Sequence, residues 1–119
     1  MADIPAIERM LKEIEGIEGV QHALLVGRSG FHIAGRLPDD VNNETFIAMF
    51  AILLGAATEA ADTLRENLES VVITTVSSRV VVVEDGPKAL FVLRVTKAAD
   101  VEKLRARVAT YTAKMAELL

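Results

Sequence analysis

The sequence predicts an α/β fold, a five-stranded antiparallel sheet with one long helix on one face and two terminal helices on the other. Apolar residues recur at helical spacing in three segments, residues 1–16, 43–67 and 101–118. Five short runs rich in valine, isoleucine and leucine read as strands, at residues 20–26, 31–35, 70–76, 79–84 and 89–96. The last three runs are almost continuously apolar, which is typical of a sheet covered on both faces.

The first helix and the first two strands have clear boundaries. Pro5 suits the first turn of a helix, and Gly16 marks its end. The strands at 20–26 and 31–35 are joined by the turn Gly27-Arg28-Ser29-Gly30. A connection this short forces the two strands to run antiparallel.

A polar linker at residues 37–43 leads into the middle helix, residues 43–67. If Asn42 caps this helix, Val41 and Phe46 occupy the positions of a hydrophobic staple. Two tight turns, at Ser77-Ser78 and at residues 84–87, separate the last three strands. A continuous amphipathic helix then runs to the end, giving the order α-β-β-α-β-β-β-α.

Composition limits the function. A chain of 119 residues is the size of one domain, spanning residues 1–119. The net charge of -4 without a basic run argues against nucleic acid as a partner, and the lack of cysteine excludes disulfides. The longest unbroken apolar run, residues 46–57, is shorter than the ~20 residues of a membrane span. With no signal peptide at the start, the expected location is the cytoplasm.

The middle helix is apolar nearly all round in its first half, although a small sheet offers it only one face to cover. Large exposed apolar patches are rare on monomers, so the pattern indicates a partner helix, most simply from a second copy. Small residues would let the two helices approach closely. The candidate seam residues are Ala48, Phe50, Ala51, Leu53, Leu54, Gly55 and Ala57.

The strand at 70–76 strengthens this prediction. It is β-branched and uncharged, without the Pro or Lys that usually protects an edge strand. At the edge of the sheet it would invite a second strand. We therefore add Val71, Val72, Ile73 and Thr74 to the predicted dimer interface.

The chain resembles the Roadblock / dynein light chain family over essentially its whole length. The segments that carry the resemblance are residues 19–26 with the turn that follows, the alanine-rich helix at 45–64 and the three strands at 70–96. The resemblance implies a profilin-like fold and a homodimer in which the 70–76 strands pair and the long helices lie side by side. Within the family, the chain is similar to the stand-alone prokaryotic type, such as the gliding-motility regulator of a GTPase.

The resemblance also implies the partner and the activity. Family members are scaffolds or regulators of small Ras-like GTPases, and others belong to dynein motors. Two positions depart from many relatives, Gly27 where they have an acidic residue and Ser77-Ser78 where they have a glycine. These departures concern the subfamily and hence the particular partner.

Catalytic motifs do not emerge from the sequence. It contains no phosphate-binding glycine-rich loop, so the chain is not itself a GTPase. His22 and His32 could approach each other across the first hairpin, but an incidental pair is the better account. The remaining candidates are explained by the preference of acidic side chains for helix N-termini and of polar side chains for turns. These are Asp39, Asp40, Glu44, Ser29, Ser77, Ser78, and the possible arginine fingers Arg28, Arg36 and Arg79.

The predicted function is therefore a non-enzymatic homodimer without a cofactor or metal that docks a small Ras-like GTPase. Its docking rim would comprise Glu59, Asp62, Arg65 and Glu66. Two alternatives stay open. One is a structural dimerisation subunit without a GTPase, and the other is a PAS-type sensor of a small ligand.

Overall fold

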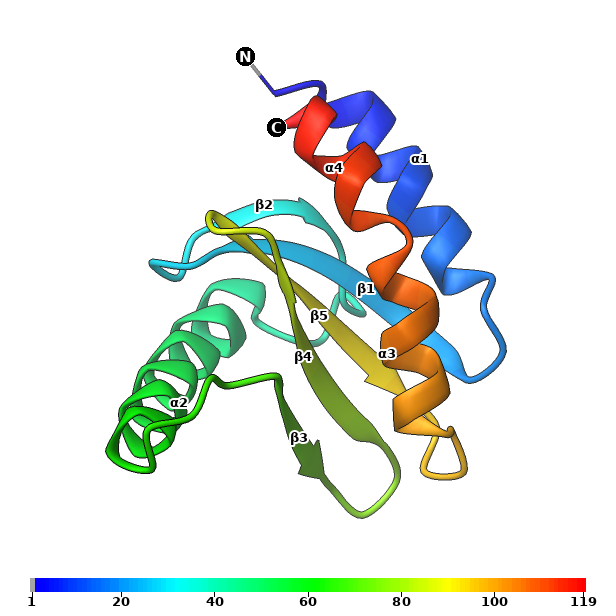
Figure 1. Cartoon of the computed structure of the whole chain (residues 1–119). Coiled ribbons are helices and arrows are strands. Elements are labelled where there is room, and N and C mark those ends of the chain that lie inside the picture. The colour runs from blue at the N-terminus through cyan, green and yellow to red at the C-terminus, as the bar shows by residue number, and fades with distance from the viewer. Residues whose placement is uncertain (1) are drawn as a thin grey trace.

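The computed structural model describes residues 2–119 and has the predicted layered architecture (Figure 1). Its five strands form one antiparallel sheet in the order β2-β1-β5-β4-β3. The elements are α1 (Ile4–Glu15), β1 (Val20–Gly27), β2 (His32–Gly35), α2 (Asn43–Thr63), β3 (Ser70–Thr74), β4 (Arg79–Asp85), β5 (Ala89–Val95), α3 (Val101–Ala109) and α4 (Thr112–Leu118). The predicted fold class is confirmed.

Two cores lie on opposite faces of the sheet. Alternate residues of the central strands, such as Leu93 and Val81, pack with α1, α3 and α4, whereas their neighbours Val92 and Val82 pack under α2. Figure 1 shows α2 on one side of the sheet and the other helices on the opposite side. The double coverage explains why these strands carry almost no polar side chains.

Helix caps set where the first two helices begin. The Asp3 carboxylate accepts a hydrogen bond from the Ala6 N–H, and Pro5 lies in the first turn of α1. The Asn42 side chain likewise accepts from the Thr45 N–H at 3.0 Å. This bond confirms the predicted cap. Val41 and Phe46 both pack on the core beneath α2, as the predicted staple requires. Residue 1, included in the predicted first helix, lies outside the described residues.

The predicted C-terminal helix is in fact two helices, which corrects the expected three-helix count. At the break, the N–H groups of Thr110 and Tyr111 bond to carbonyls three residues back, and α4 then begins at Thr112. The Thr110 hydroxyl donates to the Arg107 carbonyl at 2.7 Å. This local bond competes with the helical pattern, as threonine hydroxyls often do.

The edge formed by β2 is short. Gly35 ends this strand with φ of +91°, and a Cβ placed there would lie 2.3 Å from the Ala23 carbonyl oxygen. Beyond it, the Glu15 carboxylate accepts a hydrogen bond from the Ala23 N–H at 3.0 Å. A side chain of α1 therefore takes the place of a neighbouring strand at this end of β1.

Candidate interaction surface

Helix α2 leaves most of its apolar surface uncovered. Only Ile47 and Leu54 are buried among its residues, although the helix is the most apolar in the chain. Met49 is 55% exposed and Ile52 is 66% exposed. Such exposure of large apolar side chains on one element is unusual for a monomer.

By length and composition, α2 is also the one helix among the described residues that could cross a membrane. The longest unbroken apolar run is shorter than a membrane span, but α2 as a whole is long and apolar enough because its few polar residues lie near its ends. Only 11% of its most apolar stretch is buried. The helix is therefore not enclosed by the rest of its own chain.

The two flanks of α2 differ in charge. Spacings of three and four residues place side chains on one side of a helix. One stripe, here called the uncharged flank, comprises Met49, Leu53, Ala56 and Ala60. The opposite stripe, here called the acidic flank, comprises Glu44, Ala48, Gly55, Glu59 and Asp62.

Packing against the first hairpin fixes which way each flank faces. Ala51 lies beside the acidic flank, and a Cβ placed on Gly30 would lie 2.7 Å from the Ala51 Cβ. Gly30 belongs to the turn between β1 and β2, so the acidic flank is directed toward that end of the sheet. The uncharged flank consequently faces the other edge, where β3 lies. Leu68, which precedes β3, and Val71, which lies within it, pack into the same core as Phe46 and Phe50.

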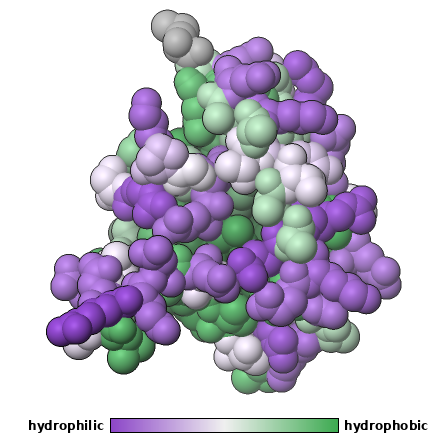
Figure 2. Space-filling view, in the orientation of Figure 1, coloured by the Kyte–Doolittle hydropathy of each residue, from purple (hydrophilic) through white to green (hydrophobic). Residues whose placement is uncertain are grey.

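Strand β3 forms the edge beside this flank, as predicted. Its pairing with β4 puts Val71 and Ile73 on the face covered by α2, opposite Val82 and Val80. Val72 points to the other face and is 42% exposed. Figure 2 shows apolar surface at β3, in the space between α2 and α3. The uncharged flank and β3 thus lie toward the same edge of the sheet, and together they are here called the apolar margin.

The predicted seam residues do not all lie on this margin. Leu54 is a core residue of the single chain, and Phe50 and Ala57 are half-buried. Ala48 and Gly55 belong to the acidic flank, and Ala51 touches the first hairpin. Leu53 and the β3 residues lie where a partner could reach them. Met49, Ala56, Ala60 and the 71%-exposed Leu64, which are not among the predicted seam residues, are exposed as well.

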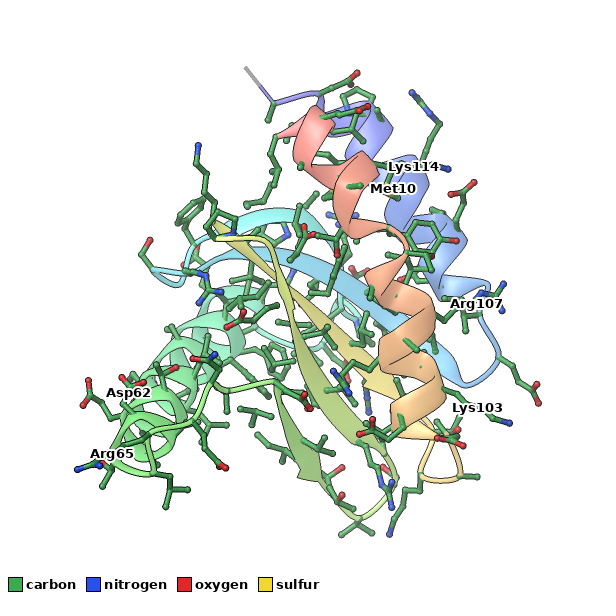
Figure 3. The ribbon with its side chains drawn as sticks, in the orientation of Figure 1. Met10, Asp62, Arg65, Lys103, Arg107 and Lys114 are labelled. Atoms are coloured by element: carbon green, nitrogen blue, oxygen red, sulfur yellow. The ribbon has the colours of Figure 1, made fainter. Side chains whose placement is uncertain are left out.

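The predicted docking residues are all exposed. Glu59 and Asp62 lie on α2, and Arg65 and Glu66 lie in the turn after it. Figure 3 shows Asp62 and Arg65 projecting from the C-terminal end of α2. Arg28, one of the possible arginine fingers, is bound to Glu84 at 3.0 Å and lies near the Gly86 carbonyl.

The register of the first hairpin separates the two histidines. His32 is opposite Val26, whereas His22 lies beyond the end of β2 and is paired with Arg94 of β5. The suggested approach of His22 and His32 is therefore wrong. His22 instead lines an open cleft of about 360 Å³ between α1 and the edge of β1, together with Glu8, Lys12, Glu15 and Arg36.

The strongest electrostatic perturbation lies away from this surface. Asp85 ends β4 and is 4% exposed. Burial raises the pKa of its carboxyl from the usual 3.8 to about 6, although a hydrogen bond with the Thr112 side chain opposes this shift. Nothing in the sequence pattern distinguished this aspartate from an ordinary turn residue.

The model of the Roadblock/LC7 domain matches residues 6–94 of the chain. The chain belongs to the Roadblock/LC7 family. Its relatives include the uncharacterized protein MJ1340 of Methanocaldococcus jannaschii, which is 32% identical over 111 residues, covering 84% of this chain and 97% of the relative. The resemblance to the family is thereby confirmed.

Solved structures of Roadblock domains share the fold. The gliding protein MglB of Thermus thermophilus superimposes with a TM-score of 0.78 at 24% identity, covering 92% of this chain and 85% of that one. MglB of Myxococcus xanthus superimposes with a TM-score of 0.84 at 12% identity, covering 97% and 95% of the two chains. At these identities the likeness is one of fold.

Proposed function

We propose that this Roadblock domain is a homodimeric scaffold or regulator of a small Ras-like GTPase and acts by docking. The observation that carries the proposal is the apolar margin, in which large apolar side chains of α2 and of the edge strand β3 are exposed. Other members of the family regulate GTPases, which supports the choice of partner. The chain itself has no phosphate-binding loop, so the nucleotide belongs to the partner.

A second copy is the occupant that best fits the margin. Around a two-fold axis each residue meets its own counterpart or a close neighbour, so a charge near the axis would face a like charge. Neither Met49, Leu53, Ala56 and Ala60 nor the residues of β3 carry a charge. In this arrangement Leu53 and Met49 of the two copies pack together, and Leu54 stays in its own core.

A lipid bilayer is the competing occupant of α2. Glu44, Glu59 and Asp62 would have to enter or flank the apolar phase, where charged groups are costly. Ile47 and Leu54 would also have to leave the sheet against which they are packed. A partner helix covers the exposed side without either change.

Docking of a GTPase would then use the side of the dimer that the seam leaves free. Glu59, Asp62, Arg65 and Glu66 remain exposed there, and three of these four residues are acidic. A partner surface with complementary basic residues would associate faster at low salt. The charged rim would set the orientation of the GTPase and its association rate. The exposed apolar residues beside it, such as Ile52, would supply contact area.

The dimer is tested by sedimentation velocity on the full chain and two matched variants. Leu53→Glu buries an unpaired charge at the seam, and we expect a mass of one chain. Ala48→Glu places the same charge on the acidic flank, and we expect the parent's mass of two chains. Loss of the dimer in both variants, or in neither, would contradict the proposed seam. A parent that is monomeric until lipid vesicles bind it would point to the bilayer.

The GTPase is tested by affinity capture from native lysate with GTP or GDP, followed by mass spectrometry. We expect one small P-loop GTPase to be enriched in one nucleotide state, and its hydrolysis rate to change when the purified domain is added. Leu53→Glu serves as the control that lacks the dimer. Capture of other proteins alone, in both states, would favour a purely structural dimerisation subunit.

A further inference from the structure

The open cleft between α1 and β1 lies beside a stretch of strand that has no neighbour. Strand β1 has eight residues, but β2 is paired only with the residues from Leu24 to Val26. The cleft, here called the edge cleft, lies along the first half of β1, and its other lining residues come from α1 and from positions 35–38. Its volume of about 360 Å³ is within the range of small-molecule sites, about 300–1,000 Å³.

The register of β1 places the two walls of the edge cleft on opposite faces of the sheet. Leu11 of α1 packs into the core beneath α1, whereas Leu37 packs into the core beneath α2. His22 shares a face with Leu24, which also belongs to the core beneath α2. The edge cleft therefore runs around the edge of the sheet. Its buried lining residues Leu11, Ala23 and Leu37 give it an apolar floor.

The two walls differ in charge. The α1 wall carries Glu8 and Glu15 with Lys12 between them, which is two negative charges and one positive charge, or a net charge of -1. The opposite wall carries Arg36 and His22, and no acidic residue lines it. A ligand in the edge cleft thus meets an acidic side and a basic side.

The polar groups of both walls are available to a ligand. None of the charged residues of the edge cleft forms an ion pair within residues 2–119. The Glu15 Oε2 atom accepts the hydrogen bond from the Ala23 N–H, which holds the carboxylate in place and leaves Oε1 free of that bond. The Nδ1 atom of His22 is buried without a hydrogen-bond partner in the described part of the chain. Such an atom is costly unless another group supplies the missing bond.

We propose that the edge cleft binds a small zwitterion, an α-amino acid with an aliphatic side chain. Its ammonium group faces Glu8 and the Oε1 atom of Glu15. Its carboxylate faces Arg36, whose planar guanidinium matches the two oxygens of a carboxylate, and accepts a hydrogen bond from His22 Nδ1–H in the tautomer that carries this proton. The aliphatic side chain covers the apolar floor. A simple anion would leave the acidic wall unpaired, and a simple amine would leave the basic wall unpaired.

The proposal is separate from the proposed dimer, because the edge cleft and β3 lie at opposite edges of the sheet. It is tested by NMR titration of the isotope-labelled full-length chain with L-leucine and two analogues. Isocaproate lacks the ammonium group of leucine, and isopentylamine lacks its carboxylate. We expect L-leucine to shift the amide signals of Ala23 and Gly35 with a Kd of about 1 mM, as suits a small ligand in an open cleft. Each analogue should bind about tenfold more weakly, because one wall stays unpaired.

Two matched pairs of variants locate the site. Glu8→Gln and Glu13→Gln remove the same charge from α1, but only Glu8 lines the edge cleft. Arg36→Gln and Arg9→Gln are the corresponding cationic pair. All four side chains are exposed, so each variant should keep the fold. We expect the Kd for L-leucine to rise about two- to fivefold in Glu8→Gln and Arg36→Gln, as for other exposed ion pairs, and to stay at the parent's value in the two controls.

Three results would overturn the proposal. One is the absence of any shift at Ala23 and Gly35 with L-leucine. Another is equal affinity for leucine and both analogues, since the two charged walls would then contribute nothing. The third is an equal loss of affinity in the variants of the edge cleft and in their controls. The sedimentation experiment on the parent chain decides the dimer independently of these results.

Discussion

At the scale of single residues, Asp85 lowers the stability of the fold when its buried carboxyl is ionised. Its carboxyl is buried beneath the start of α4, and one of its oxygens, Oδ2, has no hydrogen-bond partner among residues 2–119. An ionised carboxylate is disfavoured there because burial removes its water. The folded protein therefore holds the proton of Asp85 more tightly than the unfolded chain does.

The pH dependence of stability follows from this difference. Since the pKa of Asp85 is about 6 in the fold and 3.8 in its usual state, its contribution to stability is full below pH 4 and falls as the pH rises to about 6. We expect Asp85→Asn to gain up to about 3 kcal/mol relative to the parent between pH 4 and pH 7. Urea unfolding of both proteins across this range measures the gain. A difference that is independent of pH would exclude ionisation of Asp85 as its cause.

Two glycines with positive φ angles provide a matched pair. At Gly35 a new Cβ would lie 2.3 Å from a backbone oxygen, whereas at Gly86 no atom of the described residues lies within 4 Å. We expect Gly86→Ala to cost about 1–2 kcal/mol for the left-handed backbone alone. Gly35→Ala should cost at least about 2 kcal/mol more, since the ends of β1 and β2 must move apart. Equal urea midpoints for the two variants would mean that the hairpin of β1 and β2 adjusts to the new Cβ at residue 35 without a cost in stability.

At the scale of elements, the end of α2 shows a conflict between backbone and side chain. The Glu66 N–H donates to the Ala61 carbonyl and the Arg65 N–H to the Asp62 carbonyl, the two bonds of a Schellman motif. The residue between helix and loop in this motif adopts a left-handed conformation, and here it is Arg65, with φ of 60°. Glycine is the residue usually found at that position.

Arg65→Gly should consequently raise the free energy of unfolding by about 0.5–1 kcal/mol, because it removes the Cβ clash of the left-handed conformation. Arg65→Ala keeps the Cβ and should leave stability within about 0.5 kcal/mol of the parent. Thermal and urea unfolding of the three proteins provide the comparison. If Arg65 helps to dock the GTPase, both variants should weaken capture equally, which separates the two roles of the residue.

Local signals in the sequence were sufficient for most elements. Asn42 identifies the start of α2, and the valine-rich runs identify the ends of the strands to within one residue, apart from β3, which ends two residues earlier than predicted. The break between α3 and α4 was missed because the apolar spacing continues through Thr110 and Tyr111. The seam was assigned partly to Ala48, Ala51 and Gly55 because small residues permit close approach. Which side of α2 faces β3 depends on the strand order and on the contact of Ala51 with Gly30. Both involve residues far apart in the sequence, so local patterns do not predict them.

At the scale of the whole molecule, the stability of the domain and the proposed dimer are linked. The sheet face beneath α2 is covered by few side chains of that helix, chiefly Ile47 and Leu54. Contacts supplied by a second copy would hold α2 on the sheet. Folding and association should therefore occur together over a range of protein concentrations.

The measurable consequence is a melting temperature that depends on concentration. A partner that binds only the folded state stabilises it by mass action, so we expect the Tm to rise by several degrees between low micromolar and hundred-micromolar protein. The monomeric Leu53→Glu variant should melt at a lower temperature that does not change with concentration. A parent whose Tm is constant over this range would show that the fold gains nothing from association.

The short β2 strand decides how far such an assembly can grow. A sheet that is open at both margins can add copies without limit and become a fibre. Here the β3 margin is available. At the other margin β2 ends at Gly35 after four residues, and the Ala23 N–H donates its hydrogen bond to the Glu15 carboxylate. In the proposed homodimer, association through the β3 margin alone would stop at two copies and would not grow into a fibre. Glu15→Ala would reopen the blocked end, and slow turbidity in that variant would be the sign of growth past two.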